Sequence, residues 1–216
     1  MIYMVIVEWH GHACVSIKKS NDYTIVFDPH DGVSIGLPRP NVKGDLILVT
    51  HDHFDHNAVD IVKKESSRVF KEFHGEALID DVKIEGIKTY HDKFQGRRRG
   101  INTVYVVEVE GYRIAHLGDL GHKLSDELID KLRNIDLLII PVGGTYTIGP
   151  DEAWDIITEV QPNNVLPIHY WVKGLNLPLF PIDDFLVYVK KYHVVRLDTR
   201  SFKLGEYEKS IIIPRI

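Results

Sequence analysis

The feature that most constrains this chain is an H-x-H-x-D-H pattern directly after the apolar run 45–49, which predicts a buried strand. Its four potential metal ligands are His51, His53, Asp55 and His56. Residues two apart in an extended segment point the same way, so the first two histidines can bind one ion. A turn after Phe54 would let the aspartate and the last histidine face a second ion. Functional loops gather at the carboxyl ends of such strands, so the pattern predicts a two-metal site there.

Imidazole nitrogen and carboxylate oxygen together suit zinc, manganese and iron, and zinc is the first expectation for this ligand set. A pair of ions about 3.5–4 Å apart is a common device for hydrolysis. A solvated polar turn is the alternative explanation for four such side chains packed together. The buried strand predicted just before them favours the metal site.

Length and composition fit an ordinary globular protein. At 216 residues without a low-complexity linker, the chain is expected to form a single domain over residues 1–216. The net charge of −5 gives no general case for nucleic-acid binding, although a local basic groove stays open. The single cysteine forbids an internal disulfide. No stretch is apolar enough to span a membrane, and residues 1–7 resemble a first strand rather than a signal peptide, so we expect a cytoplasmic protein.

Runs rich in β-branched and apolar residues predict a mainly β protein with a few helices. Strands are predicted over residues 4–8, 14–18, 24–27, 45–49, 68–70, 83–89, 103–109, 113–116, 137–140, 165–168 and 194–197. Helices are predicted over residues 59–65, 125–134, 150–160 and 182–191. Two packed β-sheets with helices outside fit this order, with 194–197 as the last core strand.

Four more strand ends carry side chains that suit a metal site. These side chains are Asp28, His91, Asp119 and His169. Taken one at a time, a histidine after a strand is more often a packing residue, and Asp-Pro is often just a turn. Their common placement at strand ends, together with the H-x-H-x-D-H pattern, favours one shared site.

In this order the motifs resemble the metallo-β-lactamase superfamily, from Trp9-His-Gly-His12 through to His169. The likeness is to the branch that includes ascorbate-6-phosphate lactonase and many metal-dependent hydrolases. The motifs that carry it are Gly11-His12, Asp28-Pro29, His116-Leu-Gly-Asp119, Pro141-Val-Gly-Gly144 with Gly149-Pro150, and Pro167-Ile-His169-Tyr170. The resemblance implies an α+β fold, a four-layer αβ/βα sandwich with a two-metal site at one edge.

The resemblance also implies two divalent ions, zinc first, with manganese or iron as alternatives. The first ion would be bound by His51, His53 and His91, and the second by Asp55, His56 and His169, with Asp119 bridging both. Asp28 would be a buried carboxylate that orients a ligand histidine. His116 is expected to support the site in a similar way, and His12 either approaches the site or packs in the core.

The implied chemistry is hydrolysis. Two divalent ions lower the pKa of a bridging water to about 7, and the resulting hydroxide would attack an ester, lactone or phosphodiester bond of a small anionic metabolite. Asp119 would then be a catalytic residue as well as a ligand, and its type argues against β-lactam hydrolysis. His122 either donates a proton to the leaving group or is a plain hydrogen-bond partner.

Three consecutive arginines follow the predicted ligand His91. Arg97, Arg98 and Arg99 stand between Gly96 and Gly100. A guanidinium group meets phosphate bidentately, so these arginines are expected to bind an anionic substrate. A solvated surface loop is the alternative.

Two other functions stay open. One is a nuclease or cyclic phosphodiesterase, which a continuous basic groove leading to the metals would favour. The other is a sensor or scaffold that binds metal or ligand without catalysis, against which the complete ligand set argues. A closed pocket with mixed apolar and basic walls would favour the metabolite hydrolase. The sequence indicates neither the substrate nor the oligomeric state.

Overall fold

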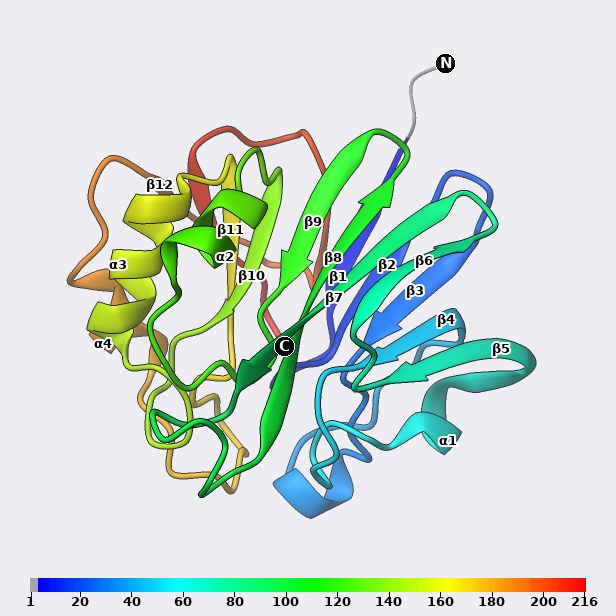
Figure 1. Ribbon diagram of the computed structural model, residues 1–216, viewed down its shortest axis with the longest axis horizontal. Coiled ribbons are helices and arrows are strands. Elements are labelled where there is room, and N and C mark those ends of the chain that lie inside the picture. Colours follow the sequence, from blue (N-terminus) through cyan, green and yellow to red (C-terminus); the bar gives the residue numbers. More distant parts are fainter. Residues whose placement is uncertain (1–3) are drawn as a thin grey trace.

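The computed structural model of the protein describes residues 4–216 and contains two mixed β-sheets packed face to face (Figure 1). The six-stranded sheet contains, in spatial order, β13 (Ser201–Lys203), β1 (Ile6–Trp9), β2 (Val15–Lys18), β3 (Thr24–Phe27), β4 (Gly44–Val49) and β5 (Lys63–Lys71). The eight-stranded sheet contains β12 (His193–Arg196), β14 (Ser210–Ile213), β11 (Asn164–Ile168), β10 (Leu137–Pro141), β9 (Tyr112–His116), β8 (Ile101–Val109), β7 (Val82–Tyr90) and β6 (Gly75–Ile79).

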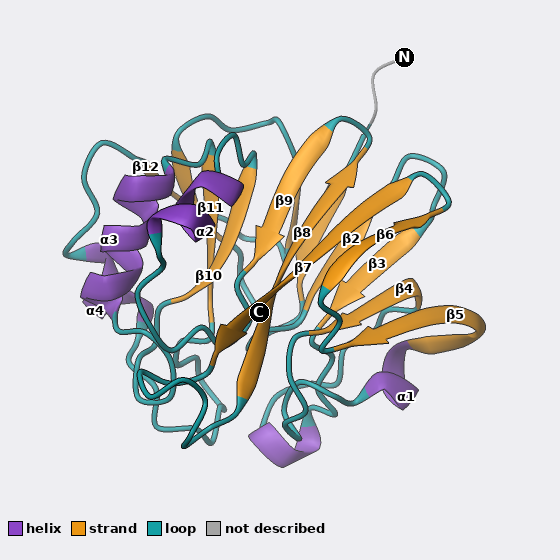
Figure 2. Cartoon of the chain, viewed as in Figure 1, coloured by secondary structure: helices purple, strands orange, loops and turns teal. Residues whose placement is uncertain are grey.

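Helices lie outside the two sheets. They are a short 3-10 helix (Val33–Ile35), α1 (Val59–Val62), α2 (Asp126–Lys131), α3 (Pro150–Val160) and α4 (Ile182–Leu186). Figure 2 shows α2, α3 and α4 in a row along the outer side of β10, β11 and β12. No helix within residues 4–216 has the length and apolar character needed to cross a membrane.

Successive side chains of a strand point to opposite faces of the sheet, so the strands contribute to two separate hydrophobic clusters, one on each face. In β3, Ile25 and Phe27 point into the main core between the sheets, while Val26 points to the outer side. There Val26 packs with Val59 and Val62 of α1. The predicted α+β sandwich is confirmed, and among the described residues its helical layer over the six-stranded sheet is reduced to the four-residue α1.

Several predicted boundaries were wrong. The helix predicted over 59–65 ends at Val62, and the chain continues directly into β5, a longer strand than the predicted 68–70. Its sequence, KKESSRVFK, is mostly exposed and lacks apolar alternation because β5 is an edge strand. The helices predicted over 125–134 and 182–191 also end earlier, at Lys131 and Leu186.

The last core strand was also placed wrongly. Residues 194–197 were predicted to fill that place, but β12 is an exposed edge strand next to β14. Ile211 and Ile212 of β14 are fully buried and belong to the main core. Strands β6, β13 and β14 were not predicted. Residues 1–3, part of the segment 1–7 that resembles a first strand, lie outside the described residues, and β1 begins at Ile6.

The topology brings the carboxyl ends of several strands together. In the six-stranded sheet β3 and β4 are parallel, so the segments that follow them leave at the same edge. In the eight-stranded sheet β9, β10 and β11 are parallel, and β7 runs in the same direction because two antiparallel pairings connect it to β9. The Thr103 N–H donates to the Thr50 carbonyl at 2.9 Å and joins the two sheets beside this edge.

Candidate metal centre

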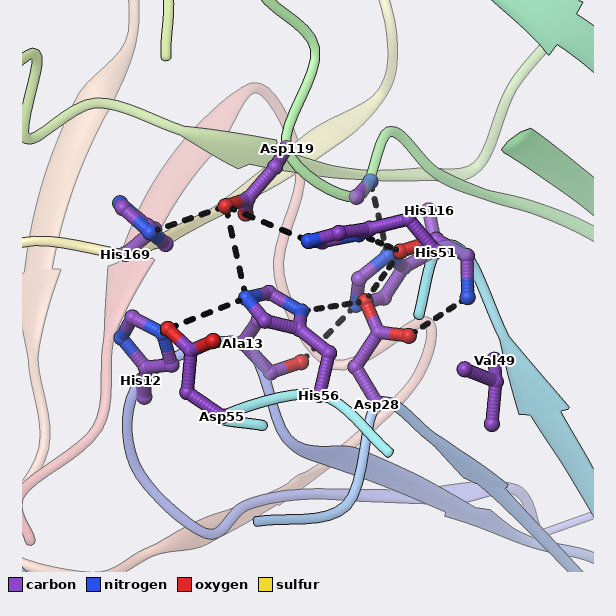
Figure 3. A network of polar contacts seen from close by, with 12 residues as sticks. His12, Ala13, Asp28, Val49, His51, Asp55, His56, His116, Asp119 and His169 are labelled. Carbon is purple, nitrogen blue, oxygen red and sulfur yellow. Dashed lines mark hydrogen bonds and ion pairs between the residues drawn. The ribbon is translucent and has the colours of Figure 1, made fainter. Parts of the chain in front are cut away.

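The structure brings all seven predicted ligands into one buried cluster. One group, His51, His53 and His91, has its ligand-type atoms within 4.8 Å of one another, and so has a second group, His12, Asp55, His56 and His169. Asp119 lies between the groups (Figure 3). Its Oδ2 is 3.1 Å from His91 Nε2 and 3.2 Å from His169 Nε2, one imidazole from each group. A single carboxylate oxygen therefore lies close to imidazole nitrogens of both groups.

The donor set fits divalent ions. His51 Nε2, His56 Nε2 and Asp119 Oδ1 are buried and have no hydrogen-bond partner among the described residues. A buried polar atom without a partner costs about 1–3 kcal/mol, so several in one cluster need a common ligand. Imidazole nitrogens and carboxylate oxygens are the ligands that zinc, manganese and iron share. The residues present therefore suit the predicted ions.

Electrostatics also favour a charged carboxylate at the centre. Burial opposes the ionised form of Asp119, but the nearby imidazoles of His169 and His56 outweigh it and hold the pKa of Asp119 well below its ordinary value. Burial likewise opposes protonation of His56, yet the carboxylates of Asp119 and Asp55 raise the pKa of His56 well above its ordinary value. The cluster is thus built to hold positive charge around ionised carboxylates.

Asp28 orients two of the ligand histidines, as the sequence predicted for one of them. Its Oδ2 accepts from the Thr50 hydroxyl at 2.7 Å and lies 3.1 Å from His56 Nδ1, which must carry the proton because a carboxylate only accepts. The Thr50 Oγ1 in turn accepts from His51 Nδ1 at 2.9 Å. Because Nδ1 of each histidine donates to these oxygens, Nε2 is the ring atom that faces the cluster, and it would be the ligand atom once a bound ion displaces any proton there.

Asp28→Asn is expected to lower metal affinity by about 10- to 100-fold, because Asp28 accepts at both oxygens: from the Thr50 N–H at Oδ1, and from the Thr50 hydroxyl and His56 Nδ1–H at Oδ2. An amide has one oxygen, so its NH2 group would face one of these donors. Asparagine is the suitable replacement, since Asp28 has a positive φ of 43° and asparagine tolerates that conformation. The measurement is competition for zinc against a chelator of known affinity, with thermal unfolding as a check on the fold. Unchanged zinc affinity in a folded variant would contradict the orienting role.

The turn that presents Asp119 is held by two side chains. His116 Nδ1 accepts from the Gly118 N–H at 3.0 Å, so its Nε2 carries the proton and donates to the Ala13 carbonyl at 3.0 Å. Both ring nitrogens of His116 are therefore hydrogen-bonded to backbone groups, which agrees with the predicted supporting role. Asn102 Oδ1 accepts from the Asp119 N–H at 2.9 Å, and its amide donates to the Leu117 carbonyl.

Asn102 was missed by the sequence analysis. The residue is fully buried at the start of β8, and Gly118 passes so close that a Cβ on Gly118 would lie 2.4 Å from the Asn102 side-chain oxygen. Gly118 also has a positive φ of 54°. A buried amide among the apolar residues of a strand was the available signal, but its partners lie in another loop and could not be read from the sequence.

His12 reaches the site. Burial, followed by the nearby His169, lowers the pKa of His12 to about 3, so the imidazole is neutral at pH 7. Its Nε2 lies 3.0 Å from Asp55 Oδ2 and must carry the proton there. This contact fixes the Asp55 carboxylate, which favours the first of the two roles considered for His12.

His122 lies in a different environment. Its Nε2 accepts from the Tyr90 N–H at 3.1 Å, so its Nδ1 carries the proton and donates to the Lys123 carbonyl at 2.7 Å. Both ring nitrogens are occupied by the backbone. The sequence left two roles open for His122. This geometry favours the role of hydrogen-bond partner and argues against the role of proton donor.

The three arginines differ in their positions. Arg99 lines a cavity of about 280 Å³ above the cluster, together with Phe54, Tyr146 and Leu177 and with five of the predicted ligands. Arg98 and Arg99 both line an adjacent cavity of about 420 Å³. All three arginines are exposed, and Arg97 lines neither of these cavities. The structure thus brings one predicted substrate-binding residue to the cluster and a second beside it.

Comparison with known proteins agrees with the geometry. Residues 6–169 match the family model described as the beta-lactamase superfamily domain. A UPF0173 metal-dependent hydrolase from Thermoplasma volcanium is 33% identical over 189 residues, which cover 75% of this chain and 82% of the relative. Another from Thermococcus onnurineus is 32% identical over 192 residues, which cover 77% of this chain and 85% of the relative.

Solved structures give the same result. A metallo-β-lactamase superfamily protein from Thermotoga maritima superimposes with a TM-score of 0.77 at 35% identity, over 97% of this chain and 98% of that protein. The likeness to the ascorbate-6-phosphate lactonase branch stays a prediction. The matched model, the relatives and the clustered histidines and aspartates together show that the chain belongs to the UPF0173 metal-dependent hydrolases of the metallo-β-lactamase superfamily.

Proposed function

We propose that the protein uses two divalent ions to hydrolyse an ester, lactone or phosphodiester bond of a small anionic metabolite. The position of Asp119 carries the proposal, because its Oδ2 lies within 3.1–3.4 Å of imidazole nitrogens from both ligand groups. Two bound ions would supply a hydroxide nucleophile at neutral pH by lowering the pKa of water to about 7.

The side chains around the ligands keep the site ordered. Asp28, His116 and Asn102 fix the ligand side chains and the Asp119 turn through hydrogen bonds that are all buried. Such preorganisation means that no rearrangement of these dipoles is needed when charge develops in the transition state. The supporting groups are therefore proposed to contribute to rate through geometry, without touching the substrate.

The cavity supports a small substrate. Its volume of about 280 Å³ lies near the lower end of the usual range for small-molecule sites, which is about 300–1,000 Å³. Phe54 and Leu177 give it apolar walls, and Arg99 adds one cationic wall residue. A nucleic-acid strand requires a basic groove along several phosphates, whereas this cavity is small and has one arginine in its lining. The metabolite hydrolase is therefore favoured over the nuclease.

A screen of lactones, phosphodiesters and thioesters with the zinc-, manganese- and iron-loaded protein tests the proposed function. Hydrolysis is expected in at least one class, to disappear when a chelator removes the metal, and to return when zinc or manganese is added back. The readouts are product formation and metal content of the same samples. Undiminished turnover by fully metal-stripped protein would contradict the proposal.

A further inference from the structure

The segment from His91 to Gly100, here called the arginine loop, is a closed and ordered structure. The His91 N–H donates to the Gly100 carbonyl at 3.1 Å, which joins the two ends of the loop. The Gly100 N–H donates to the Gly96 carbonyl at 2.9 Å. Gly96 has a φ of 78°, and a Cβ there would lie 2.8 Å from the Gly100 carbonyl oxygen, so the turn requires glycine.

The carboxylate of Asp92 organises the inside of this loop. Its Oδ1 accepts from the backbone N–H groups of Phe94 and Gly96, at 2.7 and 3.0 Å. Its Oδ2 accepts from the N–H groups of Arg98 and Arg99, at 2.9 and 2.8 Å. Asp92 is only 8% exposed, so these four bonds hold the backbone of both arginines. Asp92 was not singled out by the sequence analysis.

Two arginine side chains are stacked on aromatic rings. The Arg99 guanidinium carbon lies 4.6 Å from the centre of the Tyr146 ring, and that of Arg98 lies 4.0 Å from the centre of the Phe94 ring. Stacking uses the face of a guanidinium group and leaves the N–H donors at its edge available. The aromatic rings therefore fix the guanidinium groups without consuming their hydrogen-bonding capacity.

The charge of these arginines is uncompensated. Within residues 4–216, no carboxylate oxygen lies within 4.0 Å of a guanidinium nitrogen of Arg97, Arg98 or Arg99. The nearby Asp92 carboxylate is directed at backbone N–H groups, and Lys93 is paired with Glu152 at 2.7 Å. Two exposed guanidinium groups, each stacked on an aromatic ring, thus line the 420 Å³ cavity without a carboxylate partner.

This cavity adjoins the metal centre. His91, Arg99 and Tyr146 line both it and the cavity above the ligand cluster. A ligand can therefore place one group at the metals and a second group at the arginines. Arg99 stands at the junction, while Arg98 belongs to the outer cavity alone.

We propose that the arginine loop is a binding site for a phosphate-sized dianionic group, with Arg99 and Arg98 as its contacts and Asp92 as the positioning residue. Two guanidinium groups match two negative charges, whereas a carboxylate would need only one. This inference rests on the proposed function. The substrate would place its dianionic group at the arginines and the bond to be cleaved at the metals.

The test is calorimetric titration of inorganic phosphate into the zinc-loaded protein and its variants. Arg99→Gln is expected to weaken phosphate binding by about 10- to 100-fold, because it removes a charge-assisted contact. Arg97→Gln is the matched control: it makes the same change in the same loop, on a side chain that lines neither cavity. It is expected to change binding by less than about threefold. Equal effects of both variants, or no effect of Arg99→Gln, would overturn the proposal.

Asp92→Asn tests the positioning role. The amide keeps one acceptor oxygen and turns an N–H group toward the amides of Arg98 and Arg99, so the loop loses its order there. Phosphate binding is expected to weaken in Asp92→Asn, and the losses from Asp92→Asn and Arg99→Gln are expected to be less than additive in the double variant, because Asp92 positions Arg99 as well as Arg98. Additive losses in the double variant would contradict positioning through Arg99. Zinc content is measured in every variant, because Asp92 follows the predicted ligand His91.

Acetate and sulfate complete the titration. Sulfate is expected to compete with phosphate, and acetate to bind at least about tenfold more weakly than either dianion. Acetate binding as strong as phosphate would overturn the selectivity for a dianion. None of these measurements depends on turnover, so a failed substrate screen would affect the proposed hydrolysis and leave the phosphate result to be judged separately.

Discussion

Replacement of Asp119 by asparagine is expected to reduce hydrolysis by more than about 100-fold. Removal of a group that only orients a ligand typically costs about 10- to 100-fold, and Asp119 is placed among the ligands themselves. Its Oδ2 lies 3.1 Å from His91 Nε2 and 3.2 Å from His169 Nε2. The neutral amide would remove the negative charge shared by both ligand groups, at a position that is 2% exposed and cannot be compensated by water.

Asp52→Asn provides the matched control, because it makes the same chemical change within the H-x-H-x-D-H pattern. Asp52 is exposed and accepts a hydrogen bond from the Asn57 side chain, away from the cluster. Activity and zinc content are measured for both variants on a substrate found in the screen. Near-normal turnover by a folded Asp119→Asn protein would refute the bridging role, whatever the behaviour of the control.

The ligand cluster was predictable because its residues carry their chemistry in their type. His51, His53, Asp55 and His56 follow a strand that is apolar enough to be recognised, and the strand end fixes where they point. Asp28 and His169 also stand directly after buried strands. The rule that loops at strand carboxyl ends form sites made these residues candidates, and the resemblance to the metallo-β-lactamase superfamily joined them into one ligand set.

The supporting groups were less predictable, because their partners are backbone atoms far away in the sequence. Asn102 contacts the N–H of Asp119 and the carbonyl of Leu117, and only the pairing of β8 with β9 brings these groups together. Asp92 accepts only from backbone N–H groups, so no complementary side chain in the sequence indicated its role. Residue type shows the capacity for a hydrogen bond, but the partner depends on register.

The strands that were missed, and β5, which was predicted too short, have a related cause. β5 and β6 are at sheet edges, where one side of the backbone and many side chains meet solvent, so their sequences need no apolar alternation. The core strand β14 is only four residues long, Ser210–Ile213, at the end of a segment with few other apolar residues. Its three consecutive isoleucines were an available strand signal that the sequence analysis did not use.

His51→Ala and His169→Ala are each expected to reduce zinc content from two ions to about one per chain, because the two histidines belong to different ligand groups. Elemental analysis of the single variants alone would not show whether the same ion is lost. A pair of double variants decides this. His51→Ala with His53→Ala removes two ligands from one group, so about one ion should remain, held by the other group.

His51→Ala with His169→Ala removes a ligand from each group, and this protein should bind almost no zinc under the same conditions. His193→Ala is the control, since His193 is exposed on β12, and it should keep the full metal content. Equal zinc content in the two double variants would contradict separate sites for the two ions. The difference in zinc content between the two double variants is a cleaner test than the single variants. Both double variants lose two histidines, and they differ only in whether one ligand group stays complete.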